Sequence, residues 1–166
     1  KTGYSWWISR IRHAAVLYDV LRFDHFRGFD EYYAIPFGEK TARNGNWMPG
    51  PGMGLMNAIE ENVEDIEIIA EDLGTITDSV RDLLEESGYP GMKVLEFAFG
   101  GGSDNPYLPH NYDTTNCVVY TGTHDNETLF QYIANASDYT RDHIKNYMNR
   151  FWDNYEQLCD NMVRLA

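Results

Sequence analysis

The order of apolar runs and amphipathic stretches along the chain predicts an α/β fold. Four runs have the length and composition of buried strands, at residues 20–24, 66–70, 92–99 and 117–121. Apolar residues recur at helical spacing in the segments 6–18, 55–62, 77–87, 126–136 and 139–165. Because strands that alternate with helices pair in parallel through right-handed crossovers, we expect a parallel sheet covered by helices.

Several predicted helices carry signals at their ends. Ser5 is a suitable N-cap for the first helix, and Thr77 or Asp78 can cap the helix that stops at Gly88. The apolar face expected for the first helix comprises Trp7, Ile11, Ala14, Ala15 and Tyr18. The spacing of apolar residues from 139 to 165 predicts one long helix that packs a single face on the core.

Two connections lack a regular period. Residues 26–54 are rich in glycine and proline but also hold aromatic residues, among them Trp47. Connections in compact domains usually have a few residues, so we expect this one to be an ordered, functional loop. Residues 100–106 contain three consecutive glycines, which predicts a mobile loop.

The number of strands decides between two architectures. A closed (β/α) barrel needs eight strands and about 250 residues, whereas this chain has 166 residues and four predicted strands. It therefore forms either an open α/β layer or about half of a barrel. The chain does not begin with methionine, and we expect it to be cut from a longer protein. No glycine-rich phosphate-binding pattern follows a strand, which disfavours a nucleotide-binding sheet.

Composition excludes several classes of partner. A net charge of −13 argues against nucleic acid and anionic membranes, both of which need cationic surfaces. The aromatic content of 14% is better suited to a neutral, hydroxyl-rich ligand. Cys117 and Cys159 form no metal-binding or redox pair, and the first residues do not resemble a signal peptide. We expect a cytoplasmic protein without a metal or other cofactor.

Three carboxylates follow three of the predicted strands: Asp24, Glu71 and Asp125. The carboxyl ends of parallel strands converge, so we expect these residues to meet at one site. Two carboxyl groups around a glycosidic bond are the minimum set for glycoside chemistry, one as nucleophile or base and one as general acid. Arg22 lies two residues before Asp24 and therefore on the same strand face, where it keeps Asp24 ionised.

Each of these residues also has a simpler interpretation. Asp24 and Arg22 can form an ordinary salt bridge, Glu71 can lie in an ordinary strand-to-helix turn, and residues 124–126 can be a helix N-cap. Asp24, His25, His124 and Asp125 are also acceptable ligands for a divalent metal in a metal-dependent hydrolase. The HxH pair typical of such barrel hydrolases is absent, which disfavours the metal site.

Four longer motifs carry a resemblance to a known family: LRFDHFRGFDEYYAIPFGEKTARNGNW, IIAEDLG, YPGMKVLEFAF and VVYTGTHDNET. Together they resemble the 4-α-glucanotransferases, or amylomaltases, of glycoside hydrolase family 77 in the α-amylase clan. The resemblance implies that Asp24 is the nucleophile, Glu71 the general acid/base and Asp125 the transition-state stabiliser. It places further residues around the substrate: Arg22 and His124 beside the reacting sugar, His25, Asp72 and Asn126 around them, and Trp47 and Phe97 or Phe99 along sugar subsites.

The same resemblance implies what the chain does and what it lacks. The expected reaction is retaining transfer of α-1,4-glucan segments to the 4-hydroxyl of another glucan or of glucose, through a covalent glucosyl-aspartate. Residues 1–166 would then be a catalytic segment with strands four to seven of the barrel. We expect such a segment to be inactive alone and to self-associate through its exposed edges. The alternatives are an α-glucan hydrolase of the same clan and a carbohydrate-binding fragment without activity.

Overall fold

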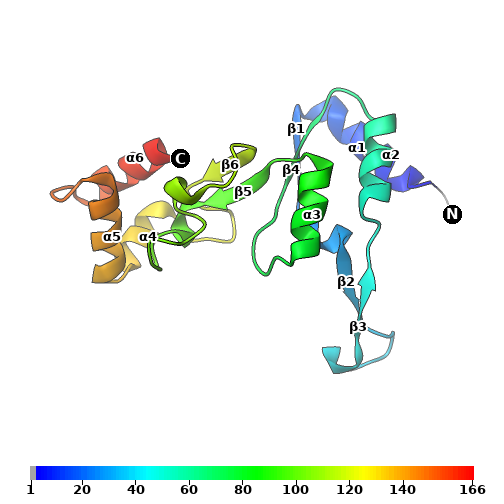
Figure 1. The fold of residues 1–166 in the computed structure, drawn as a ribbon, viewed down its shortest axis with the longest axis horizontal. Coiled ribbons are helices and arrows are strands. Elements are labelled where there is room, and N and C mark those ends of the chain that lie inside the picture. Colours follow the sequence, from blue (N-terminus) through cyan, green and yellow to red (C-terminus); the bar gives the residue numbers. More distant parts are fainter. Residues whose placement is uncertain (1–2) are drawn as a thin grey trace. The chain divides into compact units, whose positions relative to one another are not determined.

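The computed structural model describes residues 3–166 and contains two compact units, one up to Gly91 and one from Met92 onward. Each unit has its own hydrophobic core. Figure 1 shows the helices and strands of both units. The helices and strands of the first unit are, in order, α1 (Ser5–Leu17), β1 (Val20–Phe23), β2 (Glu31–Ala34), β3 (Asn46–Pro49), α2 (Met53–Asn62), β4 (Glu67–Ala70) and α3 (Asp78–Ser87). Those of the second unit are β5 (Gly91–Val94), β6 (Cys117–Tyr120), α4 (Leu129–Asn135), α5 (Asp138–Met148) and α6 (Tyr155–Leu165), with β5 starting at the boundary.

The first unit is built on a parallel pair of strands, β1 and β4. Their register runs from Val20 opposite Glu67 to Phe23 opposite Ala70. The apolar side chains that predict these strands lie in the core, since Phe23, Ile68 and Ala70 are all buried. The predicted parallel pairing of these two strands is therefore confirmed. Beyond this pair, Ala70 N–H donates to the carbonyl of Pro90, the residue just before β5 (2.9 Å).

The core of the first unit is aromatic where it meets the end of β1. A one-turn helix of the 3₁₀ type, η1 (Phe26–Phe29), follows β1 and buries both of its phenylalanines. Phe23 and Phe29 lie 5.4 Å apart between ring centroids, and Phe26 contacts Phe29 at 5.8 Å. Helices α1, α2 and α3 complete this core with Ile11, Leu55, Met56, Ile59, Val80 and Leu83.

Removing one of these rings tests how much the core stabilises the unit. Phe26 is completely buried, so Phe26→Ala should lower the free energy of unfolding by about 3–5 kcal/mol through lost burial and a cavity. Phe37→Ala is the matched control, because the Phe37 side chain is fully exposed, and it should change the value by less than about 0.5 kcal/mol. Urea denaturation followed by circular dichroism measures both; equal effects would show that Phe26 is not a core residue.

The long connection after β1 is more regular than its composition predicts. It contains η1 and an antiparallel hairpin of β2 and β3, in which Tyr33 pairs with Trp47 and Glu31 with Pro49. A short 3₁₀ turn, η2 (Ala42–Asn44), lies between the two strands. The prediction of an ordered segment is confirmed, whereas its description as a loop is wrong. Aromatic residues pair across the hairpin, and the sequence lacks the hydrophobic alternation by which a strand is usually recognised.

Two helix boundaries in the first unit differ from expectation. The residue before α1 is Tyr4 in a left-handed conformation, and Ser5 is already the first helical residue rather than the cap. The buried positions of α1 are Ile8 and Ile11, while Tyr18 lies beyond the helix and is 60% exposed.

The predicted stop at Gly88 is confirmed, because this residue has φ +70, which glycine adopts without a Cβ penalty.

The second unit pairs β5 with β6 and packs three helices on a separate core. The strand predicted at 92–99 ends at Val94, where a 3₁₀ turn, η3 (Leu95–Phe97), begins. The turn buries Leu95 and exposes Phe97, so the apolar run reflects a buried turn as well as a strand. The expectation of a single sheet is also wrong. The six strands described within residues 3–166 form three two-stranded pairs.

The predicted C-terminal helix is two helices, α5 and α6. Asn149 adopts the left-handed conformation (φ 56) and ends α5, and the Asn154 side chain caps α6. Helical spacing continues across the break because both helices pack on the same core, through Ile144, Leu158 and Met162. Helix α4 likewise begins at Leu129 rather than near residue 126, because Thr128 and Gln131 form a reciprocal capping box there.

No helix described within residues 3–166 is both long and apolar enough to cross a bilayer.

Cys117 and Cys159 are free thiols. Burial and the neighbouring Asp160 raise the pKa of the Cys159 thiol.

Candidate active site

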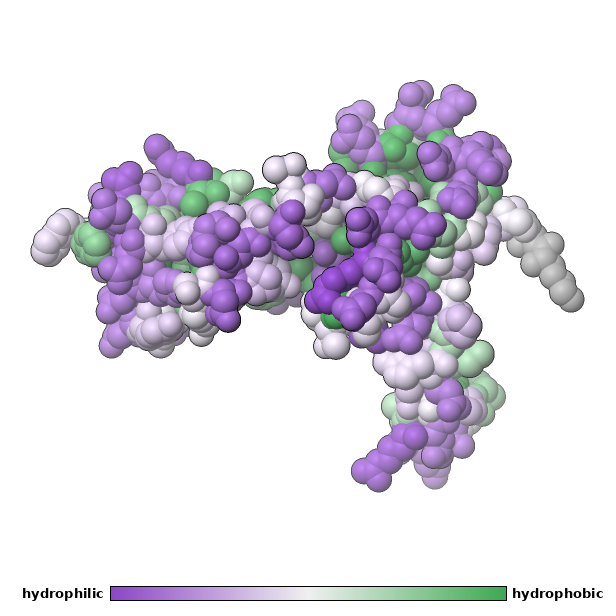
Figure 2. Space-filling model, in the orientation of Figure 1, coloured by the Kyte–Doolittle hydropathy of each residue, from purple (hydrophilic) through white to green (hydrophobic). Residues whose placement is uncertain are grey.

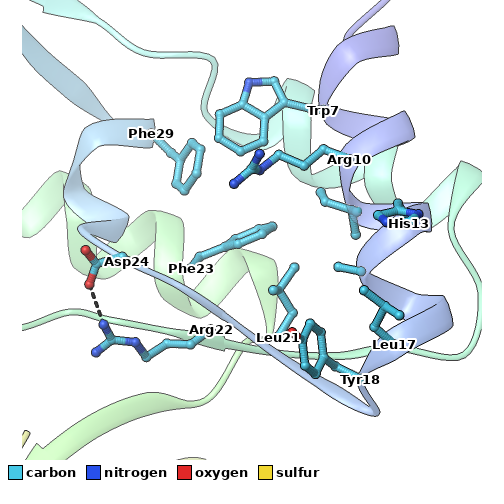
Figure 3. A pocket seen from close by; sticks show the side chains of 12 residues that line it. Trp7, Arg10, His13, Leu17, Tyr18, Leu21, Arg22, Phe23, Asp24 and Phe29 are labelled. Atoms are coloured by element: carbon cyan, nitrogen blue, oxygen red, sulfur yellow. Dashed lines mark hydrogen bonds and ion pairs between the residues drawn. The ribbon is translucent and has the colours of Figure 1, made fainter. Parts of the chain in front are cut away.

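Asp24 follows directly after β1 and pairs with Arg22. The guanidinium Nη2 lies 2.7 Å from Asp24 Oδ1, as the dashed line in Figure 3 shows. The two-residue period of the strand places both side chains on one face, as the sequence predicts. The Asp24 side chain is 72% exposed, whereas that of Arg22 is 29% exposed. The arginine therefore orients a carboxylate that stays open to a ligand.

Glu71 occupies the equivalent place after β4. The parallel ladder continues through it, because Glu71 N–H donates to the Phe23 carbonyl and Phe26 N–H donates to the Glu71 carbonyl, both at 2.9 Å. Neighbouring strands lie about 4.8 Å apart. Asp24 and Glu71 thus leave adjacent strands at the same level, one residue beyond the last paired positions.

The Glu71 carboxyl group is held by backbone amides. One oxygen accepts a hydrogen bond from His25 N–H (2.7 Å) and the other from Leu73 N–H (2.9 Å). His25 reaches this position because it adopts a left-handed conformation, with φ 51 and ψ 55. Such a conformation is uncommon outside glycine and is concentrated at functional sites. The turn after Asp24 therefore serves to orient Glu71.

The other residues predicted near these carboxylates have different neighbours. The His25 side chain is exposed, and only its backbone contacts Glu71. The Asp72 carboxyl packs against Gly91, where an added Cβ would lie 2.8 Å from Oδ2. Asp72 consequently braces the start of β5 and does not extend from the strand ends beside Asp24.

Trp47 lies on β3 of the hairpin and is 54% exposed. The Arg27 guanidinium stacks over its ring at 4.6 Å from the centroid. Arg27 also donates to Glu31 Oε1 and to the Thr75 carbonyl, both at 2.6 Å. Because Thr75 belongs to the segment that follows Glu71, Arg27 joins the hairpin to the strand end that carries this carboxylate. Sequence reasoning missed Arg27.

The third carboxylate, Asp125, lies in a tight turn after β6 in the second unit. Asn126 builds this turn, since its Oδ1 accepts from Thr123 N–H (2.8 Å) and from the Thr123 hydroxyl (2.9 Å). The turn leaves His124 and Asp125 exposed, with Nε2 and Oδ1 3.3 Å apart. Asn126 thus shapes the turn, and His124 and Asp125 are the residues open to a ligand.

The predicted residues therefore fall into two groups. Asp24, Arg22 and Glu71 belong to the first unit, and His124 and Asp125 to the second. The meeting of all three carboxylates at one site stays a prediction. Of the two phenylalanines proposed to line subsites, Phe99 is completely buried against His143 and Tyr147, so that role is wrong for it. Phe97 is exposed and contacts Tyr107 edge-on.

A fourth acidic residue, Glu96, also lies at the carboxyl end of a strand. It is only 8% exposed, and burial together with the charge of Glu127 raises its pKa to about 7. Sequence reasoning missed it, although an acidic residue inside the apolar run VLEFAF is a recognisable signal. Among the residues that the structure describes, no group of three His, Cys, Asp or Glu side chains could hold a metal ion.

Comparison with known proteins adds an independent observation. The model of glycoside hydrolase family 77, described as 4-alpha-glucanotransferase, matches residues 1–166. The 4-alpha-glucanotransferase of Clostridium butyricum is 57% identical over 129 residues, which cover 78% of this chain and 26% of that protein. The one from Streptococcus pneumoniae is 46% identical over 165 residues, 99% of this chain and 32% of that protein.

A solved structure matches the fold. The amylomaltase from Streptococcus agalactiae in complex with acarbose superposes with a TM-score of 0.85 at 39% identity, over 98% of this chain and 32% of that one. The mixed α/β content and the parallel β1–β4 pair are consistent with part of a barrel. The chain spans about a quarter to a third of the length of these relatives.

Proposed function

We propose, from the premise that this chain belongs to the 4-alpha-glucanotransferases of glycoside hydrolase family 77, that it carries the catalytic carboxylates of a retaining glucan transferase. The substrates would be α-1,4-glucans such as maltooligosaccharides, with a second glucan or glucose as acceptor. In this proposal the chain is the part of a (β/α) barrel that holds strands four to seven.

One observation carries the proposal: Asp24 and Glu71 leave adjacent parallel strands at the same level. Retaining glycosidases need two carboxyl groups about 5–5.5 Å apart, and side chains on neighbouring strands, whose backbones lie about 4.8 Å apart, can reach this separation. The two groups also differ in environment. Asp24 is exposed and paired with Arg22, which suits a nucleophile, whereas Glu71 is oriented by backbone amides.

The proposed reaction has two displacements. Asp24 attacks the anomeric carbon while Glu71 gives its proton to the leaving glycosidic oxygen, which forms a glucosyl-aspartate and frees the first product. Glu71 then takes the proton of the acceptor 4-hydroxyl as that oxygen attacks the anomeric carbon and releases Asp24. Two inversions retain the α configuration. Asp125 and His124 would bind sugar hydroxyls during this sequence.

The hairpin supports a role in substrate binding. Trp47, Tyr32 and Tyr33 are all partly exposed on β2 and β3, and exposed aromatic faces suit sugar rings. Arg27 connects this hairpin to the segment after Glu71 through Trp47 and Thr75. We propose that Trp47 contributes to a sugar subsite held in place by Arg27.

The first unit also exposes apolar surface beside the catalytic strand. Figure 2 shows hydrophobic side chains at the surface around α1, and Figure 3 shows the groove of about 480 Å³ between α1 and β1, with Asp24 and Arg22 at one end. Val16, Leu17, Tyr18 and Val20 are all at least 44% exposed. Such a surface favours association. We propose that the remaining barrel covers it, and that copies of the isolated chain associate through it.

The experiment compares the chain alone with a hybrid enzyme. In the hybrid, the chain replaces its 165 aligned residues in the Streptococcus pneumoniae relative. With maltotriose as the substrate, the hybrid should form glucose and longer maltodextrins, whereas the chain alone should be at least about 100-fold slower because most substrate contacts are missing. Chromatography of the products measures both.

The products also distinguish the alternatives. Shorter sugars without longer ones would identify an α-glucan hydrolase. A folded hybrid without either activity would favour a carbohydrate-binding fragment, and an isolated chain as fast as the hybrid would refute its proposed incompleteness. Size-exclusion chromatography of the chain tests association, and a monomer at every concentration would contradict it.

A further inference from the structure

Glu96 is a buried carboxyl group for which the proposed mechanism has no use. It lies in η3, immediately after β5, and only 8% of its surface is exposed. Its backbone N–H donates to the Thr121 carbonyl at 3.0 Å, which anchors the residue to the end of β6. Glu96 is therefore attached to the strand that leads into the turn of His124 and Asp125.

The side chain of Glu96 extends to the same turn. A Cβ added at Gly122 would lie 2.8 Å from Glu96 Oε1 and 3.0 Å from Oε2, so the carboxyl group packs directly on the glycine. Gly122 does not adopt a positive φ, so a side chain at this position would disturb the packing of the Glu96 carboxyl and not the backbone conformation. The turn continues from Gly122 to Thr123, whose amide and hydroxyl bind Asn126.

The surroundings of this carboxyl favour its uncharged form. Glu96 Oε1 has no hydrogen-bond partner among the described residues. The titratable groups on the α4 side are Glu127 and Tyr132, and those of the turn are His124 and Asp125, both exposed. Burial is the main cause and the Glu127 charge the second cause of the rise in the Glu96 pKa to about 7. A carboxylate here would be buried without compensation.

We propose that Glu96 is a positioning residue which, as an uncharged carboxylic acid packed on Gly122, holds the turn of residues 121–126 in the shape that presents Asp125. The proposal rests on the proposed function of Asp125 in glucan transfer. Ionisation of Glu96 places a charge against the backbone of Gly122 and opposite Glu127. The turn is then distorted, and Asp125 loses its position.

The direction of the pH dependence follows from the two states of the carboxyl. In the unfolded chain it ionises near its ordinary pKa of 4.5, whereas in the folded protein it keeps its proton up to about pH 7. The folded state binds more protons between these values, so stability falls as the pH rises through this window. Transfer activity should fall in turn as the pH rises through 7.

Glu96→Gln in the hybrid enzyme tests this directly, because glutamine keeps the shape of the uncharged acid. We expect the Glu96→Gln hybrid to be about as active as the unmodified hybrid at pH 6. Its activity should begin to decline at a pH at least one unit higher than that of the unmodified hybrid. Glu127→Gln should move the decline the opposite way, to lower pH, because it removes a charge that raises the Glu96 pKa. Its amide oxygen can still accept the hydrogen bond from Asn135. Glu86→Gln, on the exposed surface of α3, is the matched control and should leave the profile unchanged.

A second measurement needs no activity. In the 166-residue chain with His124→Gln, so that the turn carries no imidazole, the amide shifts of Gly122 and Thr123 should titrate with a midpoint near 7 and lose this step in Glu96→Gln. An inactive hybrid would refute the proposed function but leave this titration as the test. Identical pH profiles for Glu96→Gln and the unmodified hybrid, or amide shifts without the step, would overturn the positioning role.

Discussion

Replacing Asp24 by asparagine should lower kcat/KM of the hybrid enzyme for maltotriose by at least about 1,000-fold, because it removes the proposed nucleophile of the covalent mechanism. Asparagine has nearly the same shape and can still accept a hydrogen bond from Arg22, which lies 2.7 Å from Asp24 Oδ1. The side chain is 72% exposed, so its replacement should change stability little. A large loss of activity with unchanged unfolding would thus report on chemistry.

Two controls separate a nucleophile from a structural carboxylate. Asp19→Asn makes the same chemical change at an exposed residue just before β1 and should leave activity within about two-fold. Asp24→Gly should recover turnover of α-maltosyl fluoride when azide is added, with maltosyl azide of inverted configuration as the product, because the small anion enters the space of the carboxylate. A hybrid that keeps its activity with asparagine at position 24 would rule out this nucleophile.

Replacing Glu71 by glutamine should lower the same kcat/KM by about 10²–10⁴-fold, the usual contribution of a general acid/base. Its amide oxygen can replace only one of the two acceptors that bind His25 N–H and Leu73 N–H. Because these two hydrogen bonds are exposed or only partly buried, losing one should lower the free energy of unfolding by about 0.5–1.5 kcal/mol. The variant should consequently be both slower and less stable.

The choice of donor isolates the acid role of Glu71. Fluoride leaves without a proton, so the first displacement by Glu71→Gln should be nearly restored with α-maltosyl fluoride and strongly impaired with maltotriose. Release of fluoride in the first turnover measures that step. Glu67→Gln, at the exposed start of β4, is the control and should be normal with both donors. An equal loss with both donors would indicate that Glu71 acts only through structure.

The strand ends were predictable because short-range rules govern them. A run of apolar residues followed by charge must end where the sheet meets water or a ligand, which is why Asp24 and Glu71 could be assigned to strand ends. The two-residue period of a strand likewise predicts that Arg22 faces Asp24, and the 2.7 Å ion pair confirms it.

Other features depended on contacts that apolar periodicity does not report. The apolar run 92–99 is compatible with a buried strand and with a buried turn. Packing on the core of the second unit favours a turn after Val94. The helical period from 139 to 165 continues across Asn149 because α5 and α6 contact one core. In the hairpin, the register of Tyr33 opposite Trp47 comes from cross-strand pairing.

The strand ends that carry Asp24 and Glu71 thus illustrate what each level determines. By itself, the sequence determined the α/β class, the family, and the carboxylates at the strand ends, because these follow from local composition and motifs. Only the tertiary structure decided that the backbone amide of His25, in a left-handed turn, binds the Glu71 carboxyl and that Glu96 is buried against Gly122. These contacts join residues 46 and 26 positions apart in the chain, where the environment of a charge depends on folding and not on its neighbours in sequence.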